Sequence, residues 1–136
     1  MSKVLIVEDE SSIRVLLKKL VNDIGYTDIL ADSGELARDI LNVNRDIDLI
    51  ITDVVLGGIT GLELVEFVRS QNKLMHIPIY VCSSQLTKEE VMPYLKKGIQ
   101  LFMEKPIQGK KLQSHIIKLL EPDLSKTHYL IDGTKI

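Results

Sequence analysis

Leu49-Ile50-Ile51-Thr52-Asp53 is the stretch that decides the fold, because an apolar run of strand length ends there in a carboxylate. Two similar runs, Val4-Leu5-Ile6-Val7 and Ile79-Tyr80-Val81-Cys82, occur before and after it. All three are unbroken rather than alternating, which is typical of strands buried on both faces of a parallel sheet. They predict a sheet in which both faces are covered by helices.

Helical spacing of apolar residues separates these runs and two weaker strand candidates, residues 29–31 and 101–103. The first expected helix has Ser11 or Ser12 as its N-cap and Gly25 just after its end, and the second is capped by Ser33. Apolar residues over 62–68 indicate the third helix, and a capping box of Thr87 and Glu90 indicates the fourth. The last helix has apolar positions from Ile107 to Leu120 and is ended by Pro122. Five strands alternating with five helices predict a three-layer, doubly wound α/β domain. Pro93 falls inside the fourth helix, which is therefore expected to be short, kinked or late in starting.

Composition excludes several classes of protein. The chain has 136 residues, a size typical of one domain, and a net charge of −2, which gives no sign of nucleic-acid binding. The first apolar run is too short for a signal peptide or a membrane span, so we expect a cytoplasmic protein. Cys82, the single cysteine, is expected in the core. The histidines, His76, His115 and His128, have no metal-ligand spacing and are interpreted as surface residues.

Polar side chains stand where four of these strands end. Glu8 and Asp9 follow the first run, Asp53 ends the third, Ser83 follows the fourth and Lys105 follows the fifth. In parallel α/β sheets, ligands bind beyond the carboxyl ends of the strands. Carboxylates gathered there favour Mg²⁺ or Ca²⁺, and an added ammonium suits a transferring phosphoryl group. The residue types therefore fit metal-assisted phosphoryl acceptance on an aspartate.

Taken singly, each of these residues has an ordinary explanation. A strand-end Asp is usually a turn former or a cap. Glu8-Asp9-Glu10 also fits a solvated acidic stretch at the start of a helix. Ser83 alone fits a turn residue, and Lys105 alone fits a solvated side chain. Only their joint placement at four strand ends favours the functional interpretation.

The chain resembles the receiver domain of two-component response regulators. The resemblance runs from about Lys3 to Leu120, and its motifs are Val-Leu-Ile-Val-Glu-Asp-Glu from Val4, Leu-Ile-Ile-Thr-Asp from Leu49, Gly-Leu-Glu-Leu from Gly61, Pro-Ile-Tyr-Val-Cys-Ser from Pro78, and Phe-Met-Glu-Lys-Pro from Phe102. It implies a flavodoxin-like, chemotaxis-regulator-like five-stranded parallel sheet in the order 2-1-3-4-5.

The resemblance also implies a role for each site residue. Asp53 would accept the phosphoryl group, and Mg²⁺ would be held by Glu8, Asp9, Asp53 and the backbone carbonyl of Val55. Lys105, followed by a cis bond to Pro106, would contact the phosphoryl group. Ser83 would be the switch hydroxyl, and Phe102 the switch aromatic that moves inward when Ser83 is recruited. Such a domain is not an enzyme in the ordinary sense, because it catalyses only its own phosphorylation and dephosphorylation.

Some positions depart from the family's commonest pattern. Glu8 stands where Asp is more usual, Phe102 stands where Tyr is more usual, and Thr60 replaces an Asp. Gly57 and Gly58 predict a pliable loop after Asp53. Val55 and Gln85 occupy the positions at which the family tunes hydrolysis, and an apolar Val55 predicts slow self-dephosphorylation.

The resemblance implies a histidine kinase or phosphotransfer protein as donor, and a downstream protein or a missing output domain as receiver of the signal. Two alternatives stay open: a pseudo-receiver that binds partners without phosphorylation, and an aspartate-nucleophile phosphatase, which Val55 disfavours because a second carboxylate is expected there. We expect the receiver domain over residues 1–121 and a tail or truncated linker over 122–136. Self-association through this tail, or through the output face formed by the expected fourth helix, fifth strand and fifth helix, is a further alternative. No membrane contact or direct nucleic-acid binding is expected.

Overall fold

A computed structural model describes residues 2–44, 46–99 and 101–120 of the chain. Within them strands and helices alternate as predicted, in the order β1 (Lys3–Val7), α1 (Ser11–Asp23), β2 (Thr27–Ala31), α2 (Gly34–Val43), β3 (Leu49–Asp53), α3 (Gly61–Arg69), β4 (Ile79–Ser83), α4 (Lys88–Leu95), β5 (Leu101–Glu104) and α5 (Gly109–Leu120). The two weaker strand predictions are confirmed as β2 and β5.

The strands form one parallel sheet in the order β2-β1-β3-β4-β5, as the resemblance implied. The register aligns Val7 with Thr52 and Asp53 with Cys82, so neighbouring strands finish at nearly the same level. Ser83, at the end of β4, lies opposite Glu104 of β5. The residues that follow these strands are therefore brought to one edge of the sheet.

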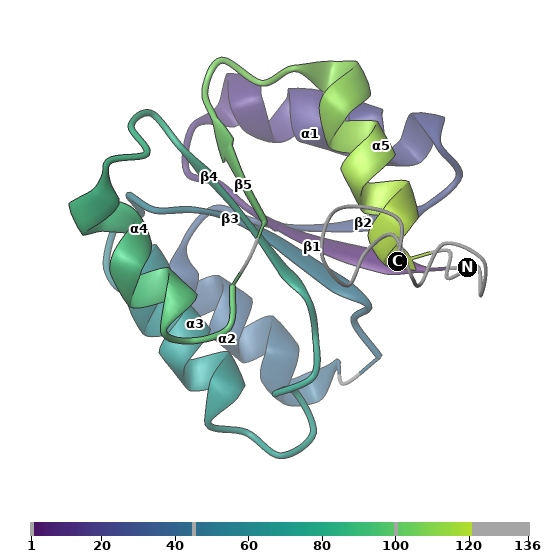
Figure 1. The fold of residues 1–136 in the computed structure, drawn as a ribbon. Coiled ribbons are helices and arrows are strands. Elements are labelled where there is room, and N and C mark those ends of the chain that lie inside the picture. Colours follow the sequence, from purple (N-terminus) through teal and green to yellow (C-terminus); the bar gives the residue numbers. More distant parts are fainter. Residues whose placement is uncertain (1, 45, 100, 121–136) are drawn as a thin grey trace, which may run out of the picture.

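Two apolar cores cover the two faces of the sheet. Figure 1 shows α1 and α5 on one face and α2, α3 and α4 on the other. Because side chains alternate along a strand, Val4 and Ile6 pack towards α1 and α5, whereas Leu5 and Val7 pack towards α2 and α3. Cys82 is buried in the first of these cores, as expected.

The start of α1 differs from the prediction. Neither Ser11 nor Ser12 is the N-cap: Glu10 takes that position, and its side chain makes no capping bond. The chain turns early because the Glu10 N–H donates to Glu8 Oε2, and the Glu10 carbonyl then accepts the first helical bond from the Arg14 N–H. The other end agrees with the prediction, since Gly25 follows the C-cap with a left-handed φ of 90°.

The later helices show two further differences. Thr87 caps α4 by accepting a bond from the Glu90 N–H, but the Glu90 side chain reaches Ser83 instead of completing the capping box. α4 has only eight residues with Pro93 inside it, which confirms the prediction of a short helix. Ile107 precedes α5, because the first helical carbonyl is that of Gln108. The peptide bond before Pro106 is cis, as expected.

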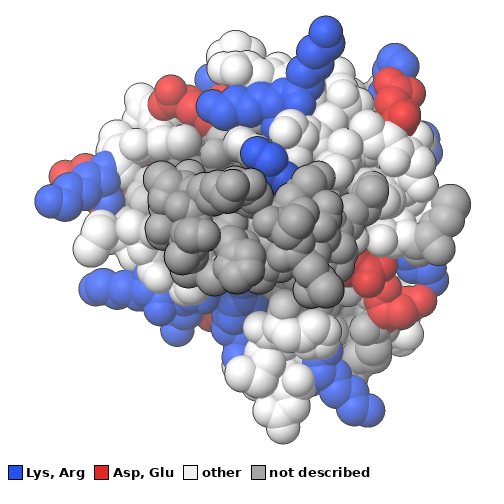
Figure 2. Space-filling view, turned by 45° about the vertical axis from the view of Figure 1, so that its right-hand side comes forward, with Lys and Arg blue, Asp and Glu red and all other residues white. Residues whose placement is uncertain are grey.

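Among the described residues, no helix is both long and apolar enough to span a membrane. Figure 2, which brings the right-hand side of Figure 1 forward, shows Lys and Arg side chains scattered around the rim of that face with acidic side chains among them. The predicted tail, residues 122–136, and with it Pro122 and His128, lies outside the described residues.

Candidate functional site

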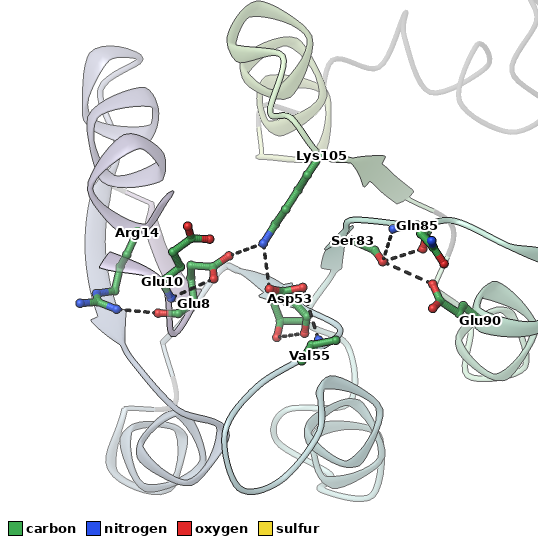
Figure 3. Close-up of polar contacts among 10 residues, drawn as sticks. Glu8, Glu10, Arg14, Asp53, Val55, Ser83, Gln85, Glu90 and Lys105 are labelled. Carbon is green, nitrogen blue, oxygen red and sulfur yellow. Dashed lines mark hydrogen bonds and ion pairs between the residues drawn. The ribbon is translucent and has the colours of Figure 1, made fainter. Parts of the chain in front are cut away.

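Three strand ends bring an ammonium group and two carboxylates into direct contact. Lys105 follows β5, and its Nζ donates to Glu8 Oε1 at 2.9 Å and to Asp53 Oδ2 at 2.8 Å. Figure 3 shows the Lys105 side chain reaching across the edge of the sheet to the space between these two carboxylates. The sequence prediction that residues 8, 53 and 105 converge is therefore confirmed.

A third carboxylate joins this contact. Glu8, Asp9 and Asp53 each offer one oxygen, and these oxygens all lie within 4.8 Å of one another. Glu8 is 1% exposed and Asp53 is 7% exposed, whereas Asp9 faces the solvent. One lysine neutralises only part of this charge, so the group fits a divalent cation that prefers oxygen ligands, Mg²⁺ above all. The exposed Asp9 leaves a side of the group open to solvent.

Burial and the hydrogen bonds of Lys105 have opposite effects on the pKa values of Glu8 and Lys105. Burial raises the pKa of Glu8, and the hydrogen bonds from Lys105 and from the Glu10 N–H offset only part of this effect. Burial alone would lower the pKa of Lys105, but its bonds to Asp53 and Glu8 outweigh it, and the net pKa is raised. Lys105 therefore stays charged at neutral pH and holds the two carboxylates together.

Hydrogen bonds that involve backbone groups fix the positions of Glu8 and Asp53. Arg14 Nη1 donates to the Glu8 carbonyl at 2.8 Å, and the Glu10 N–H donates to Glu8 Oε2 at 3.1 Å. The Val55 N–H donates to Asp53 Oδ1 at 3.3 Å, so the backbone of residue 55 lies beside the Asp53 carboxylate. The Val55 side chain itself is 69% exposed and offers no polar group.

Ser83 lies at the same edge, but the hydrogen bonds of its hydroxyl go to residues other than Asp53. Its Oγ donates to the Gln85 carbonyl at 2.6 Å and accepts from the Gln85 N–H at 3.2 Å. A longer contact of 3.4 Å joins it to Glu90 Oε2 on α4. In Figure 3 this group stands apart from the contact of Lys105 with Glu8 and Asp53. The hydrogen bonds of the Ser83 hydroxyl therefore go to residues of the β4–α4 loop and of α4.

Phe102 is partly buried against the core and packs edge-on against Tyr94 of α4, with ring centroids 6.3 Å apart. Tyr94 is buried, and its hydroxyl has no hydrogen-bond partner among the described residues. Burial, together with the charges of Asp53 and Glu90, raises the pKa of Tyr94 to about 12. Tyr94 also lines an open, mostly apolar groove of about 370 Å³ between α4 and the loop after Asp53. The aromatic pair thus connects β5 with the neighbourhood of Asp53.

Sequence reasoning missed Arg14, Glu90 and Tyr94 as neighbours of the site. Arg14 lies in the first turn of α1, and its side chain reaches back past the start of the helix to the Glu8 carbonyl, six residues earlier. The contacts of Glu90 and Tyr94 depend on how α4 packs, which no local motif encodes. His115 was wrongly interpreted as a surface residue: it is partly buried, and its Nδ1 lies 2.7 Å from the buried Tyr80 hydroxyl.

Comparison with known proteins agrees with this geometry. Residues 4–117 match the family model of the response regulator receiver domain. The chemotaxis protein CheY of Pseudomonas aeruginosa is 30% identical over 120 residues, which cover 88% of this chain and 96% of that protein. CheY1 of Helicobacter pylori is 34% identical over 115 residues, covering 84% and 93%. The structure of Vibrio cholerae CheY4 has a TM-score of 0.82 at 30% identity and covers 88% and 99%. The chain therefore belongs to the response regulator receiver domain family of two-component signalling proteins.

Proposed function

We propose that this receiver domain accepts a phosphoryl group on Asp53 with the help of Mg²⁺ and thereby switches a protein-interaction surface. The observation that carries the proposal is the Lys105 ammonium, which bridges Glu8 and Asp53 while the Asp9 carboxylate lies within 4.8 Å of both. This combination supplies a nucleophile, a cation for the transferred group and oxygen ligands for a metal.

In the proposed reaction, an Asp53 carboxylate oxygen forms a bond to phosphorus as the bond between phosphorus and the leaving atom of the donor breaks. The leaving group departs with the electron pair of that bond and is then protonated. Mg²⁺, held by Glu8, Asp9, Asp53 and the Val55 carbonyl, would supply charge neutralisation for the phosphoryl oxygens. Lys105 would move from its bonds with the carboxylates to a phosphoryl oxygen. The chain would catalyse only this transfer and the later hydrolysis of the aspartyl phosphate, in which water releases inorganic phosphate and restores the Asp53 carboxylate.

The switch follows from the two arrangements open to Ser83. A phosphoryl group on Asp53 offers the hydroxyl a charged acceptor, which makes a stronger hydrogen bond than a neutral carbonyl. Ser83 would then leave Gln85 and Glu90, and Phe102 would move inward. α4, β5 and α5 would present the changed surface to a downstream protein or output domain. The donor would be a histidine kinase or phosphotransfer protein, and the cytoplasm would be the compartment.

Two other functions fit less well. A phosphatase with an aspartate nucleophile needs an acid–base carboxylate two residues further on, where this chain has the exposed, apolar Val55. A pseudo-receiver has no need of a nucleophile, a lysine and an acidic group in mutual contact.

The test is the intact mass of the protein after incubation with a small phosphodonor, with and without Mg²⁺, beside an Asp53→Asn control. We expect the gain of one phosphoryl group that requires both Mg²⁺ and Asp53. If neither the small donor nor histidine kinases phosphorylate a folded, Mg²⁺-binding protein, the pseudo-receiver becomes the better interpretation.

A further inference from the structure

The loop between β3 and α3, residues 54–60, is tied to α2 by a carboxylate. Glu35 is the second residue of α2, and its Oε2 accepts a hydrogen bond from the Ile59 N–H at 3.0 Å. The two residues are 24 positions apart in the sequence. This contact therefore joins the C-terminal end of the loop to α2, although the loop itself leads into α3.

Two glycines allow this close approach. A Cβ on Gly58, whose φ is +80°, would lie 2.0 Å from Glu35 Oε2. A Cβ on Gly34 would lie 2.3 Å from Cγ1 of Ile59. Neither distance is compatible with a side chain at the glycine position. Gly58, one of the glycines that suggested a pliable loop, thus has a second role, which is to let the Glu35 carboxylate and the loop come together, and Gly34 of α2 leaves room for Ile59.

The near end of the same loop forms part of the phosphorylation site. The Val55 N–H donates to Asp53 Oδ1, and the Gly61 N–H donates to the Val54 carbonyl at 3.1 Å, which closes the base of the loop. Thr60 is fixed by a complete capping box with Glu63. Residues 56–58 lie between these fixed points, and Glu35 anchors the loop where they meet Ile59.

We propose that Glu35 is a positioning residue of the phosphorylation site, which holds the 54–60 loop so that the Val55 backbone stays in place for Mg²⁺ and the phosphoryl group. The inference rests on the proposed function of Asp53. The hydrogen-bond acceptor is what matters, so Gln, whose amide oxygen also accepts, should replace Glu35, whereas Ala should not.

The test measures Mg²⁺ affinity by calorimetry and Mg²⁺-dependent phosphorylation by intact mass for the full chain and its variants. Glu35→Ala should weaken Mg²⁺ binding by about two- to tenfold, the range that one net hydrogen bond corresponds to. Its phosphorylation should be slow at low Mg²⁺ and recover at saturating Mg²⁺. Glu35→Gln should behave like the wild type. Glu66→Ala, which removes an exposed carboxylate from α3, is the control for charge and should also behave like the wild type.

A second variant approaches the same contact from the other side. Gly58→Ala should push the Glu35 carboxylate away from Ile59, so it should weaken Mg²⁺ binding, and adding Glu35→Ala to it should change little more. Unaltered Mg²⁺ affinity in folded Glu35→Ala would overturn the inference, and so would a Glu35→Gln variant as impaired as Glu35→Ala. If instead the wild type itself binds Mg²⁺ normally but takes up no phosphoryl group, it is the proposed function of Asp53 that fails.

Discussion

At the scale of single residues, the site has three carboxylates and one ammonium group, so its negative charge is only partly neutralised. Glu8, Asp9 and Asp53 face one another, and Lys105 bonds two of them. A cation that binds only the folded state stabilises it by mass action, by about 1.4 kcal/mol at a concentration ten times its dissociation constant. We expect Mg²⁺ at that concentration to raise the free energy of unfolding of the wild type by this amount, which is measured as a higher urea midpoint. EDTA should abolish the increase.

Asp53→Asn provides the matched variant. It removes one of the mutually repelling carboxylates, so its midpoint in EDTA should be equal to or higher than that of the wild type, and its gain from Mg²⁺ should be smaller. Urea unfolding followed by circular dichroism measures both quantities. An equal gain from Mg²⁺ in the two proteins would show that the metal binds somewhere other than at Asp53.

His115 provides a residue-scale prediction about pH. Burial lowers its pKa, and the nearby Lys111 and Lys118 lower it further, while the Tyr80 hydroxyl is its hydrogen-bond partner. A folded pKa below the unfolded value of 6.5 means that the unfolded chain binds more protons. The contribution of His115 to stability is therefore present above pH 6.5 and is lost as pH falls through the lower folded pKa.

His115→Gln tests this prediction, because the Gln side chain can still accept a bond from Tyr80 but does not titrate. The free energy of unfolding of the wild type should fall more steeply than that of the variant when pH is lowered from 7.5 to 5. Urea unfolding at a series of pH values measures the difference between the two slopes. Parallel curves would mean that His115 has the same pKa in both states.

The site residues could be predicted because each stands at the end of a strand or directly after it, and parallel strands finish at one edge of the sheet. Residue types at fixed sequence positions were enough for Glu8, Asp53 and Lys105. The orientation of Ser83 was not predictable in the same way, since it depends on competing acceptors at Gln85 and Glu90. Glu35 was missed for a related reason: only the packing of α2 against the loop shows its contact with Ile59.

At the scale of the elements, we expect α4 to be less stable than the other helices, for a reason that is visible in the sequence. Pro93 has no backbone N–H and therefore leaves one turn without its hydrogen bond. The second half of the capping box is also missing, because Glu90 turns towards Ser83. We expect the amides of α4 to exchange with solvent faster than those of α3, which has nine residues, a complete capping box and no proline.

Hydrogen exchange followed by NMR measures this difference, and α3 serves as the internal control. Pro93→Ala should restore the donor and slow exchange in α4, with a gain of up to about 3 kcal/mol, the usual cost of proline in a helix interior. Strong protection throughout α4 in the wild type would contradict the prediction.

Helix positions were predicted better than helix ends. Apolar spacing located four of the five helices because it reflects packing on the sheet, which many residues specify together. The fourth, α4, was located by its capping signal at Thr87. Caps depend on one or two side chains: Ser33 and Thr87 cap α2 and α4 as predicted, but the Glu90 side chain has another partner in Ser83. At α1, the Glu8 carboxylate makes the chain turn one residue before the serines that local preference favours as caps.

At the scale of the whole molecule, the site lies between the start of α1 and the β4–α4 loop, and the hydrogen bonds on these two sides differ in kind. On one side Glu8 is held by Glu10 and Arg14 of the α1 segment, through contacts that phosphorylation of Asp53 does not need to break. On the other side, Ser83 can reach a phosphoryl group only by giving up its contacts with Gln85 and Glu90. Loss of the Glu90 contact would free the third residue of α4, and the Tyr94–Phe102 packing would extend the change from α4 to β5.

This asymmetry predicts where the proposed phosphorylation of Asp53 would alter the molecule. Hydrogen exchange measured by mass spectrometry, with phosphodonor and Mg²⁺, should change in peptides covering the β4–α4 loop, α4 and β5, and should stay constant in peptides covering α1 and β2. Asp53→Asn under the same conditions controls for the effects of Mg²⁺ and donor. Ser83→Ala should accept the phosphoryl group but lose most of the change in α4, since its side chain has no hydroxyl to leave Glu90. An equal response on both sides of the sheet would mean that the signal spreads through the strands themselves rather than through Ser83 and α4.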